Sequence, residues 1–208
     1  MGIKVNIGIF GGTFDPIHLG HIEVAKLAIS EINLDKVIFV PSRCPQLKTT
    51  LPKASPQQRL DMVKLATGNE EMFQASDIEI KRDGPTFTFD TLEEIKESCS
   101  PKTVLWFIVG SDAFSEFDKW ENYEGILRIS KICVVRRWVN NQELDQFRHI
   151  KRLANENNLT FINRMTPQTS SSRVREMMEE KNEVKKLLDP KVYNYIIRNE
   201  LYGNIKAN

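Results

Sequence analysis

Short apolar runs alternate with stretches of helical periodicity along the whole chain. Five of the apolar runs have the length and the content of β-branched and aromatic residues that are typical of strands. These runs are Val5–Phe10, Lys36–Val40, Val104–Val109, Ile132–Val135 and Leu159–Ile162. A sixth strand is expected at Ile78–Ile80, where two isoleucines flank Glu79 and follow a period of two.

Helical patterns fill most of the intervals between these runs. Helices are predicted at His18–Ile32, Thr91–Cys99, Gln142–Asn157, Ser172–Glu180 and Lys191–Tyr202. One more helix is predicted to begin at Ser55. The clearest start is at Ser55, because Pro56 occupies the first helical position and Gln58 follows at the spacing of a capping box.

This alternation predicts an α/β fold with a doubly wound, mostly parallel sheet and helices on both of its faces. Sheets of this kind bind ligands at the carboxyl ends of their strands, near the point where the strand order reverses. No internal repeat, low-complexity stretch or long linker divides the chain. We therefore expect a single domain over residues 1–208, with a core from residue 1 to about residue 165 and a small helical part over the remainder.

The charge balance argues against some classes of partner. Lys and Arg number 29 and Asp and Glu number 28, so the formal net charge is +1. Binding to nucleic acid or to an anionic membrane through the whole surface needs a larger positive excess, so neither partner is expected. The run Val104–Val109 is too short to span a membrane, and Lys4 and Asn6 interrupt any N-terminal signal sequence, which predicts a cytoplasmic location. The three cysteines show no CxxC spacing, which argues against a disulfide framework or a zinc ribbon.

Two of the three histidines lie directly after the first predicted strand. His18 and His21 are three residues apart, so their side chains share one face of the predicted helix. Before them, Gly11 and Gly12 permit a tight turn and a close approach of the backbone to a ligand. The free N–H groups of a helix start favour an anion, so the segment predicts a phosphate site. A dinucleotide-binding turn would need a GxGxxG pattern and an acidic residue at the end of the second strand, and both are missing.

Two other interpretations of this segment stay open. The glycines could simply form a tight turn, with both histidines on an idle helix surface. The pair His18 and His21 could also ligate a metal ion, but no third ligand stands at a suitable spacing, so no metal site is predicted.

A second candidate phosphate site lies near the end of the chain, at Thr169–Arg175. A run of serines that opens a helix commonly caps it, and Ser171 or Ser172 is expected to do so. A capping role for the serines does not explain Arg173 and Arg175, because the helix dipole disfavours cations in a first turn. An anion bound between the helix start and a guanidinium would resolve this mismatch.

The segment from Gly11 to His21 resembles the signature of the nucleotidyltransferases, a strand followed by GG-T/S-F-D-P-x-H-x-G-H. More narrowly, the chain is similar to the bacterial nicotinate mononucleotide adenylyltransferase family over nearly its whole length. The family's second signature, I-S-S-T-x-I-R, is matched at Ser170, Ser171 and Arg175, whereas Ser172 stands in place of the threonine.

A middle loop also follows the family, with a departure. Pro41, Pro45 and Lys48 fit the family pattern P-x-x-x-P-P-H-K, whereas Gln46 and Leu47 replace its proline and histidine. The missing histidine weakens any role of this loop in acid–base or donor chemistry.

The resemblance implies a Rossmann-like nucleotidyltransferase fold whose C-terminal helices complete an ATP site. It implies adenylyl transfer from ATP to nicotinate mononucleotide, with Mg²⁺ accompanying the ATP. The implied catalytic residues are His18, His21 and Arg175. The implied ATP-binding residues are Gly11, Gly12, Thr13, Phe14, Gly110, Asp112, Ser170, Ser171 and Ser172. The implied mononucleotide-binding residues are Lys48, Thr86, Phe87, Thr88, Trp120 and Arg137.

Three alternatives remain at this point. The acceptor could be nicotinamide mononucleotide, or another phosphate such as phosphopantetheine, in place of nicotinate mononucleotide. The chain could also be a nucleotide-binding regulator that has lost catalysis, an interpretation that only the Gln46–Leu47 departure supports. A homo-oligomer is compatible with the sequence, which does not decide the oligomeric state.

Overall fold

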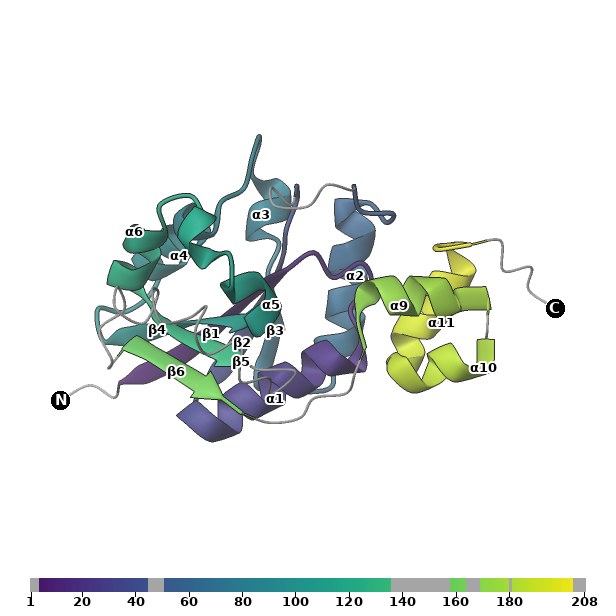
Figure 1. Cartoon of the computed structure of the whole chain (residues 1–208), viewed down its shortest axis with the longest axis horizontal. Helices are drawn as coiled ribbons and strands as arrows, with labels where there is room; N and C mark the ends of the chain where they lie inside the picture. Colours follow the sequence, from purple (N-terminus) through teal and green to yellow (C-terminus); the bar gives the residue numbers. More distant parts are fainter. Residues whose placement is uncertain (1–3, 45–50, 136–157, 164–168, 180, 204–208) are drawn as a thin grey trace. The chain divides into compact units, whose positions relative to one another are not determined.

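The sheet has the strand order of a doubly wound α/β fold. The computed structural model describes residues 4–44, 51–135, 158–163, 169–179 and 181–203 (Figure 1). Six strands form one sheet in the order β3-β2-β1-β4-β5-β6, and the pairs β1–β4, β4–β5 and β5–β6 are parallel. The strands are β1 (Val5–Gly12), β2 (Lys36–Pro41), β3 (Phe73–Ala75), β4 (Thr103–Gly110), β5 (Lys131–Val135) and β6 (Leu159–Ile162). The predicted fold class is therefore confirmed.

Helices alternate with these strands along the described chain. The α-helices are α1 (Leu19–Ile32), α2 (Pro56–Thr67), α3 (Ile78–Lys81), α4 (Thr88–Glu97), α5 (Ser111–Phe114), α6 (Tyr123–Ile129), α9 (Ser171–Glu176), α10 (Lys181–Val184) and α11 (Pro190–Arg198). Short 3₁₀ turns are η1 (Phe117–Lys119), η3 (Met177–Glu179) and η4 (Lys185–Leu187). The capping box of α2 is present, because Ser55 and Gln58 each accept a hydrogen bond from the other's backbone N–H, at 3.2 and 2.9 Å. Within the described segments, no helix is long and apolar enough to cross a membrane.

The predicted strand at Ile78–Ile80 is wrong, because these residues form the single turn of α3. The backbone N–H of Lys81 donates to the Asp77 carbonyl at 3.0 Å, and the two side chains form an ion pair at 3.0 Å. Glu79, which a half-buried strand would turn toward solvent, is buried in this turn. Three alternating residues are too few to distinguish a strand from a helical turn that buries its polar residue.

The strand that the sequence analysis missed is β3, a few residues earlier. It spans three residues, of which Phe73 is buried and Gln74 is exposed. Directly after it, the backbone N–H of Ser76 donates to the carbonyl of Phe39 at 2.9 Å. A strand this short carries too little alternation to be recognised. The helix predicted at Gln142–Asn157 lies outside the described residues.

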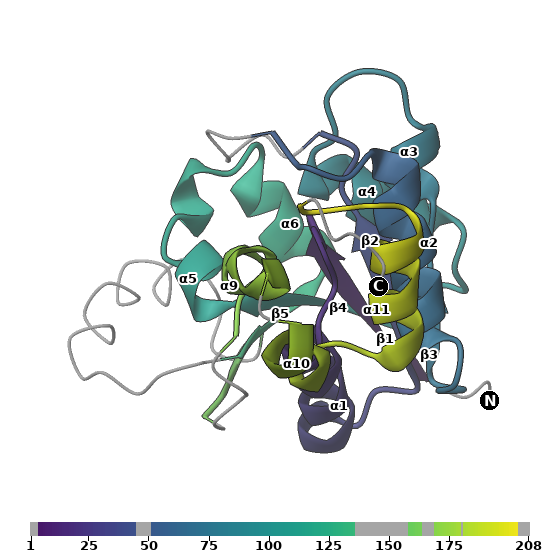
Figure 2. The same ribbon diagram turned by 90° about the vertical axis from the view of Figure 1, so that its right-hand side faces the viewer.

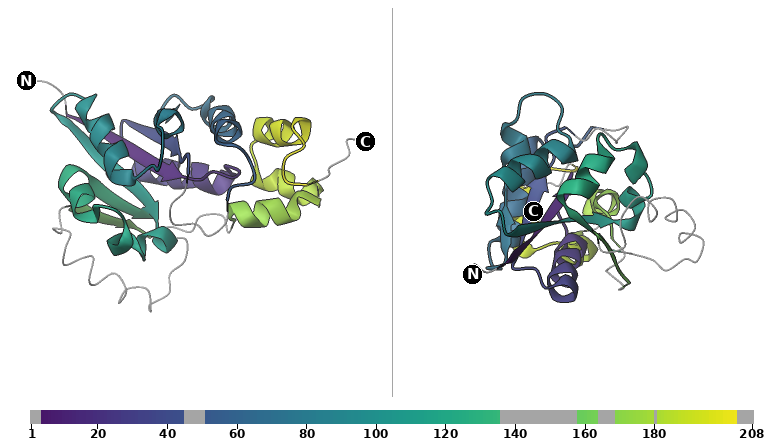
Figure 3. Two further views of the ribbon diagram at one scale, coloured as in Figure 1. Left: turned by 90° about the horizontal axis from the view of Figure 1, so that it is seen from above. Right: turned by 90° about the vertical axis from the view of Figure 1, so that its left-hand side faces the viewer.

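The chain divides into two compact units. Unit 1 comprises Met1–Gly11, Val24–Ile38 and Phe87–Thr166, and unit 2 comprises Gly12–Glu23, Phe39–Thr86 and Pro167–Asn208. In unit 1, β4, β5 and β6 run side by side, α5 packs on β4 and β5, and α4 packs on α6 (Figure 3). In unit 2, α11 packs against α2, and α2 packs against β3 (Figure 2). The single-domain division expected from the sequence stays a prediction.

The strand order reverses between β1 and β4. These two strands run parallel in register, with Phe10 opposite Ile108, so their carboxyl ends are neighbours. Nearly all of β4 is buried, as expected for a central strand that is covered on both faces. Ligands of doubly wound folds bind at this point of the sheet. The chain leaves β1 here and enters the segment that carries His18 and His21, the two histidines predicted to be catalytic.

Candidate nucleotide-binding site

The turn after β1 is built around a buried aromatic ring. Phe14 is 2% exposed and has a φ of 49°, a left-handed conformation that is uncommon for a bulky residue. A Cβ atom on Gly12 would lie only 3.0 Å from the Phe14 ring, a tight contact that would require the buried ring to shift. The carbonyl of Gly12 accepts a hydrogen bond from the backbone N–H of Ser42 at 2.9 Å. Packing of this turn therefore explains why glycine occupies position 12.

The two histidines meet as their spacing predicts. Their rings are stacked, with centroids 3.7 Å apart and an interplanar angle of 27°. His18 is buried at the start of α1, and His21 is half-buried on its first turn, edge-on to Phe14 at 5.0 Å. A Cβ atom on Gly20 would lie 3.0 Å from both His18 Nδ1 and Thr169 Cγ2. The glycine between the histidines thus makes room for the first imidazole, and the second signature begins beside it.

One hydrogen bond sets the tautomer of His21. Its Nδ1 atom accepts a bond from the backbone N–H of His18 at 3.2 Å. An accepting Nδ1 carries no proton, so the neutral ring carries its proton on Nε2. The fold therefore presents His21 as a hydrogen-bond donor through Nε2.

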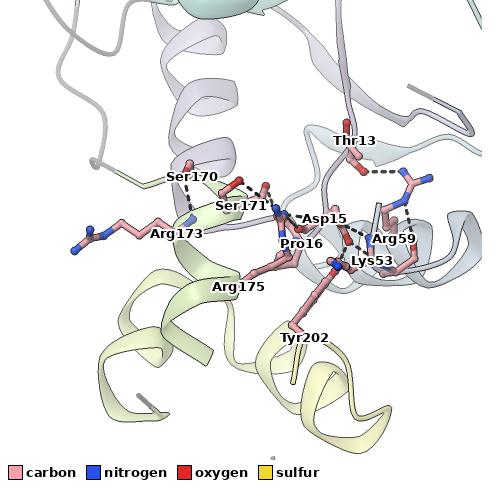
Figure 4. Close-up of polar contacts among 12 residues, drawn as sticks. Thr13, Asp15, Pro16, Lys53, Arg59, Ser170, Ser171, Arg173, Arg175 and Tyr202 are labelled. Carbon is pink, nitrogen blue, oxygen red and sulfur yellow. Dashed lines mark hydrogen bonds and ion pairs between the residues drawn. The ribbon is translucent and has the colours of Figure 1, made fainter. Parts of the chain in front are cut away.

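Asp15 is the buried centre of a polar cluster in unit 2 (Figure 4). Its side chain is 6% exposed and accepts hydrogen bonds from the backbone N–H groups of Lys53 at 2.8 Å and Ala54 at 3.0 Å. It also accepts one from the Tyr202 hydroxyl at 2.7 Å, and it pairs with the Arg175 guanidinium at 3.7 Å. A buried carboxylate needs such partners to offset its lost hydration. We call Asp15, Lys53, Arg59, Arg175 and Tyr202 the Asp15 cluster.

Arg175 fastens α9 to the turn after β1. Its Nη1 donates to the backbone carbonyl of Asp15 at 2.6 Å, and its Nη2 donates to Ser172 Oγ at 3.1 Å. The hydroxyl of Ser171 donates to the carbonyl of Pro16 at 3.0 Å. Residues from both sequence signatures are therefore joined directly, although about 155 positions of the chain separate them.

The cap of α9 is not the residue that the sequence suggested. Ser170, and neither Ser171 nor Ser172, is the N-cap, and its Oγ accepts from the backbone N–H of Arg173 at 3.1 Å. The side chain of Arg173 is exposed and points away from the Asp15 cluster, whereas that of Arg175 points into it (Figure 4). The two arginines of this turn are therefore not equivalent. Sequence reasoning treated both as cations without a protein partner and missed the pairing of Arg175 with Asp15.

Arg59 supports the same turn and was also missed. It is fully buried, and its guanidinium donates to the carbonyls of Thr13 at 2.7 Å, Arg43 at 3.2 Å and Ala54 at 3.4 Å. Burial lowers the pKa of Arg59, and the nearby Asp15 carboxylate opposes that shift. The signal in the sequence is the position of Arg59 on the face of α2 that also carries Met62 and Val63, both buried.

Tyr202 gave no signal in the sequence, because its partner Asp15 is 187 positions away. It follows α11 and has a φ of 65°. Burial raises the pKa of its hydroxyl, and the adjacent Asp15 carboxylate raises it further. Tyr202 is therefore neutral at physiological pH and donates its proton to the carboxylate.

Two residues that are predicted to bind ATP, Gly110 and Asp112, lie in unit 1 at the end of β4. Gly110 is the N-cap of α5 and has no capping side chain, so neither Ser111 nor Asp112 caps this helix. Ser111 is buried, whereas Asp112 is exposed in the first turn. The exposed carboxylate of Asp112 can accept hydrogen bonds from a ligand. A Cβ atom on Gly11 would meet Phe107 at an ordinary 3.7 Å, so packing does not demand glycine there.

Trp120 belongs to an aromatic cluster of unit 1, formed by Phe107, Phe114, Phe117, Trp120 and Tyr123. The Trp120 ring is 5.6 Å from that of Phe107 and 5.5 Å from that of Phe117, centroid to centroid. The residue as a whole is half-buried, and its Nε1 atom is buried with no hydrogen-bond partner among the described residues. The indole is thus at least partly core, as is usual for tryptophan.

The segment from Thr86 to Thr88, which is predicted to bind the mononucleotide, contains a helix start. Helix α4 begins at Thr88, three residues before the predicted start, and its N-cap residue Phe87 makes no side-chain capping bond. The first backbone N–H groups of α4 therefore lack a capping side chain. In unit 2, Thr86 is buried, and its hydroxyl has no partner among the described residues. A buried hydroxyl of this kind is costly unless something accepts or donates to it.

Two predicted residues, Lys48 and Arg137, lie outside the described residues. Where the structure describes the chain, no group of three or more His, Cys, Asp and Glu side chains could hold a metal ion. The histidine pair has no third ligand there.

The fold and the two joined signatures define a nucleotidyltransferase. The family model described as cytidylyltransferase-like matches residues 9–177, which include both signatures. The chain belongs to the nicotinate-nucleotide adenylyltransferase family. It is 36% identical over 200 residues to the probable nicotinate-nucleotide adenylyltransferase of Clostridium botulinum, covering 95% of this chain and 99% of the relative. The corresponding protein of Dehalococcoides mccartyi is 35% identical over 204 residues, covering 96% and 98%.

Solved structures agree with this assignment. The nicotinic acid mononucleotide adenylyltransferase of Plasmodium falciparum, in complex with NaAD, has a TM-score of 0.73 and 26% identity. The comparison covers 95% of this chain and 97% of that chain. The same protein in complex with APC has a TM-score of 0.70 and 25% identity, with the same coverage.

Proposed function

We propose that this chain transfers the adenylyl group of ATP to nicotinate mononucleotide, yielding nicotinate adenine dinucleotide and pyrophosphate in NAD biosynthesis. The names of its relatives and the NaAD complex of the Plasmodium falciparum protein support the proposal. The observation that carries it is the stacked histidine pair on a turn that Asp15 and Arg175 join to the second signature. This arrangement gathers donors and positive charge in one unit of the fold.

In the proposed reaction, a phosphate oxygen of the mononucleotide attacks the α-phosphorus of ATP. The bond from that phosphorus to the oxygen that bridges it to the β-phosphorus breaks, and pyrophosphate leaves with its electron pair. No covalent enzyme intermediate is required. Catalysis rests on positioning and on stabilising the spread negative charge. His21 donates through Nε2–H to an α-phosphate oxygen, and His18 holds that ring by stacking and by its backbone N–H.

Arg175 and the serines of α9 receive the departing phosphates. A guanidinium has five N–H donors, and the contacts with Asp15 and Ser172 use only part of them among the described residues. The remaining donors suit phosphate oxygens, which arginine binds in a bidentate manner. Ser170 caps the helix by accepting, so its hydroxyl proton can still be donated to a ligand. Thr13 and Phe14 shape the turn after β1, to which Arg175 binds.

Mg²⁺ enters as part of the substrate, bound to the phosphate oxygens of ATP. The described residues offer no cluster that would hold it, and the Asp15 carboxylate is already occupied by donors. When bound, the ion would neutralise charge on the leaving pyrophosphate.

The acceptor, nicotinate mononucleotide, is assigned to the residues that the sequence analysis predicts to bind it. The uncapped N–H groups of α4, at Phe87 and Thr88, suit the pyridine carboxylate, and the buried hydroxyl of Thr86 supplies a further donor. The indole of Trp120 offers a face for the pyridine ring. On the ATP side, the exposed Asp112 accepts from ribose hydroxyls. Gly11, Gly12 and Gly110, together with Lys48 and Arg137, keep their predicted binding roles.

Pyrophosphate release with Mg-ATP tests the proposal, with nicotinate mononucleotide, nicotinamide mononucleotide and phosphopantetheine compared at equal concentration. We expect release with the first acceptor to exceed release with either of the others. Preference for the amide would retain the chemistry and overturn the carboxylate role of Thr86–Thr88. Release with phosphopantetheine alone, or nucleotide binding without release, would overturn the proposal. The lack of a nucleic-acid partner, the oligomeric state and the cytoplasmic location stay predictions.

A further inference from the structure

Tyr202 connects the end of the described chain to the turn that carries both histidines. Its hydroxyl lies 2.7 Å from Asp15 Oδ1, a contact between residues that are 187 positions apart. Tyr202 follows α11, which packs against α2 (Figure 2). Figure 4 shows the Tyr202 side chain reaching from the C-terminal segment to Asp15. No step of the proposed reaction uses this tyrosine.

The two oxygens of the Asp15 carboxylate have different partners. Oδ1 accepts from the backbone N–H of Ala54 at 3.0 Å and from the Tyr202 hydroxyl. Oδ2 accepts from the backbone N–H of Lys53 at 2.8 Å and faces Arg175 Nη1 at 3.7 Å. Tyr202 is the only side chain among the described residues that is shown to hold Oδ1, so it helps to fix the rotation of the carboxylate and the direction of Oδ2.

That direction bears on Arg175. Its Nη1 atom is held between the Asp15 carbonyl, at 2.6 Å, and Asp15 Oδ2. A rotation of the carboxylate would move one of these two contacts and would change the direction in which the other guanidinium donors point. Directed hydrogen bonds to phosphate are sensitive to displacements of this kind.

We propose that Tyr202 is a positioning residue for phosphate binding, acting through Asp15 on Arg175. The proposal rests on the proposed function of Arg175 as a ligand of the ATP phosphates. Tyr202 itself touches no substrate in this account. Its hydroxyl suits the role, because it stays neutral beside the buried carboxylate and donates a proton to it.

A purely structural role is the competing explanation, and Tyr195 provides the matched control. Its hydroxyl donates to Asp61 Oδ2 at 3.2 Å. This is again a tyrosine–carboxylate bond, but it joins α11 to α2. Asp61 accepts its side-chain hydrogen bonds from Gln57 and Tyr195, and neither residue belongs to the turn after β1 or to the Asp15 cluster. Tyr195→Phe therefore removes the same atom and the same type of bond outside the Asp15 cluster.

The experiment measures binding of inorganic pyrophosphate by calorimetry, and the KM values for ATP and nicotinate mononucleotide, in three proteins. These are the wild type, Tyr202→Phe and Tyr195→Phe. We expect Tyr202→Phe to weaken pyrophosphate binding and to raise the KM for ATP by about tenfold, the scale of one lost charge-assisted bond. The KM for the mononucleotide should stay within about twofold, as should all three values in Tyr195→Phe. A mere loss of folded protein would lower kcat and leave both KM values unchanged.

A second background tests whether the effect passes through Arg175. In Arg175→Ala, adding Tyr202→Phe should weaken pyrophosphate binding no further, because the residue being positioned is gone. An additive effect in the double variant would overturn the proposed route. Equal pyrophosphate affinity and equal KM for ATP in wild type and Tyr202→Phe would overturn the positioning role itself.

Failure of the proposed function would give a different pattern. A wild type that binds pyrophosphate but transfers no adenylyl group would contradict that function, while the calorimetric comparison would still decide the role of Tyr202. A wild type that transfers adenylyl groups normally, with a Tyr202→Phe variant identical to it in every value, would overturn the positioning role alone.

Discussion

The Asp15 cluster of unit 2 and the aromatic cluster of unit 1 are held together in opposite ways. In the first, a carboxylate and two guanidiniums make directed bonds between residues as far apart as 187 positions, and most of these bonds engage backbone atoms. In the second, rings pack edge-on or tilted with centroids 5.3–6.1 Å apart, between residues that are near one another in the sequence.

This difference suits two kinds of ligand group. Directed polar bonds fix individual atoms, which is what donors to a charged phosphate require. Ring packing fixes a surface with wider tolerance, which is sufficient for stacking against an aromatic ligand. The first cluster should therefore be sensitive to the loss of single atoms, and the second should respond mainly to the loss of a whole ring.

The largest effect is expected for His21→Ala. This change removes the Nε2 donor that the His18 backbone orients, so turnover should fall by on the order of 10²-fold or more. Because His21 is half-buried on the first turn of α1, circular dichroism and the melting temperature should show an intact fold. Steady-state kinetics with Mg-ATP checks the rate. Turnover close to that of the wild type would remove His21 from catalysis.

Arg175 and Arg173 provide a comparison within a single helical turn. Arg175→Ala should lower kcat/KM for ATP by roughly 10- to 100-fold, because it removes a charge-assisted phosphate contact. Arg173→Ala removes the same charge from an exposed side chain that points away from the cluster, so its effect should stay within about twofold. Similar losses in both variants would show that net charge matters, and not the position that Asp15 gives to Arg175.

Trp120 tests the tolerance of the aromatic cluster. Trp120→Ala should raise the KM for the mononucleotide by about tenfold and leave the KM for ATP near its original value. Trp120→Phe keeps a ring against Phe107 and Phe117, so it should retain most of the affinity. Measuring both KM values in both variants checks this. An effect selective for ATP, or equal effects on the two substrates, would take Trp120 out of the pyridine site.

The smallest effect is expected for Thr86→Val, with opposite signs for stability and affinity. Removing a buried hydroxyl that lacks a partner among the described residues should stabilise the protein by about 1 kcal/mol. The KM for the mononucleotide should rise about threefold, because a donor to the ligand is lost. Thr91→Val is the matched control, since the Thr91 hydroxyl donates to the Phe87 carbonyl at 3.2 Å. Thermal melting and kinetics together check both signs.

The local pattern of the sequence is enough to predict most strands of the sheet, its longest helices and the two segments that meet at the candidate site. Five strands and the capping box of α2 follow from hydrophobic period and from side-chain chemistry that acts over a few residues. The error at Ile78–Ile80 and the omission of β3 both involve three residues, too short a stretch for period to decide. Of the C-terminal helices, α9 and α11 were also found, with ends displaced by up to four residues, whereas the short α10 was not.

The partners of the site residues could not be predicted in the same way. Arg175 was singled out because the helix dipole disfavours a cation in a first turn, but the carboxylate that pairs with it is 160 positions away. Asp15 was visible only as one letter of a signature, although it is the centre of the cluster. Tyr202 gains its role from a contact that no local pattern encodes. Tertiary packing determines which distant polar groups meet, and sequence period carries no information about it.

The path of the α-phosphorus of ATP tests the central claim most directly. ATP labelled at the α-phosphate, incubated with the wild-type protein and nicotinate mononucleotide, should transfer its label to nicotinate adenine dinucleotide and leave the pyrophosphate unlabelled. The His21→Ala variant should show this transfer at a rate lower by on the order of 10²-fold. Label that remains in ATP, or appears only in AMP, would contradict adenylyl transfer to the mononucleotide.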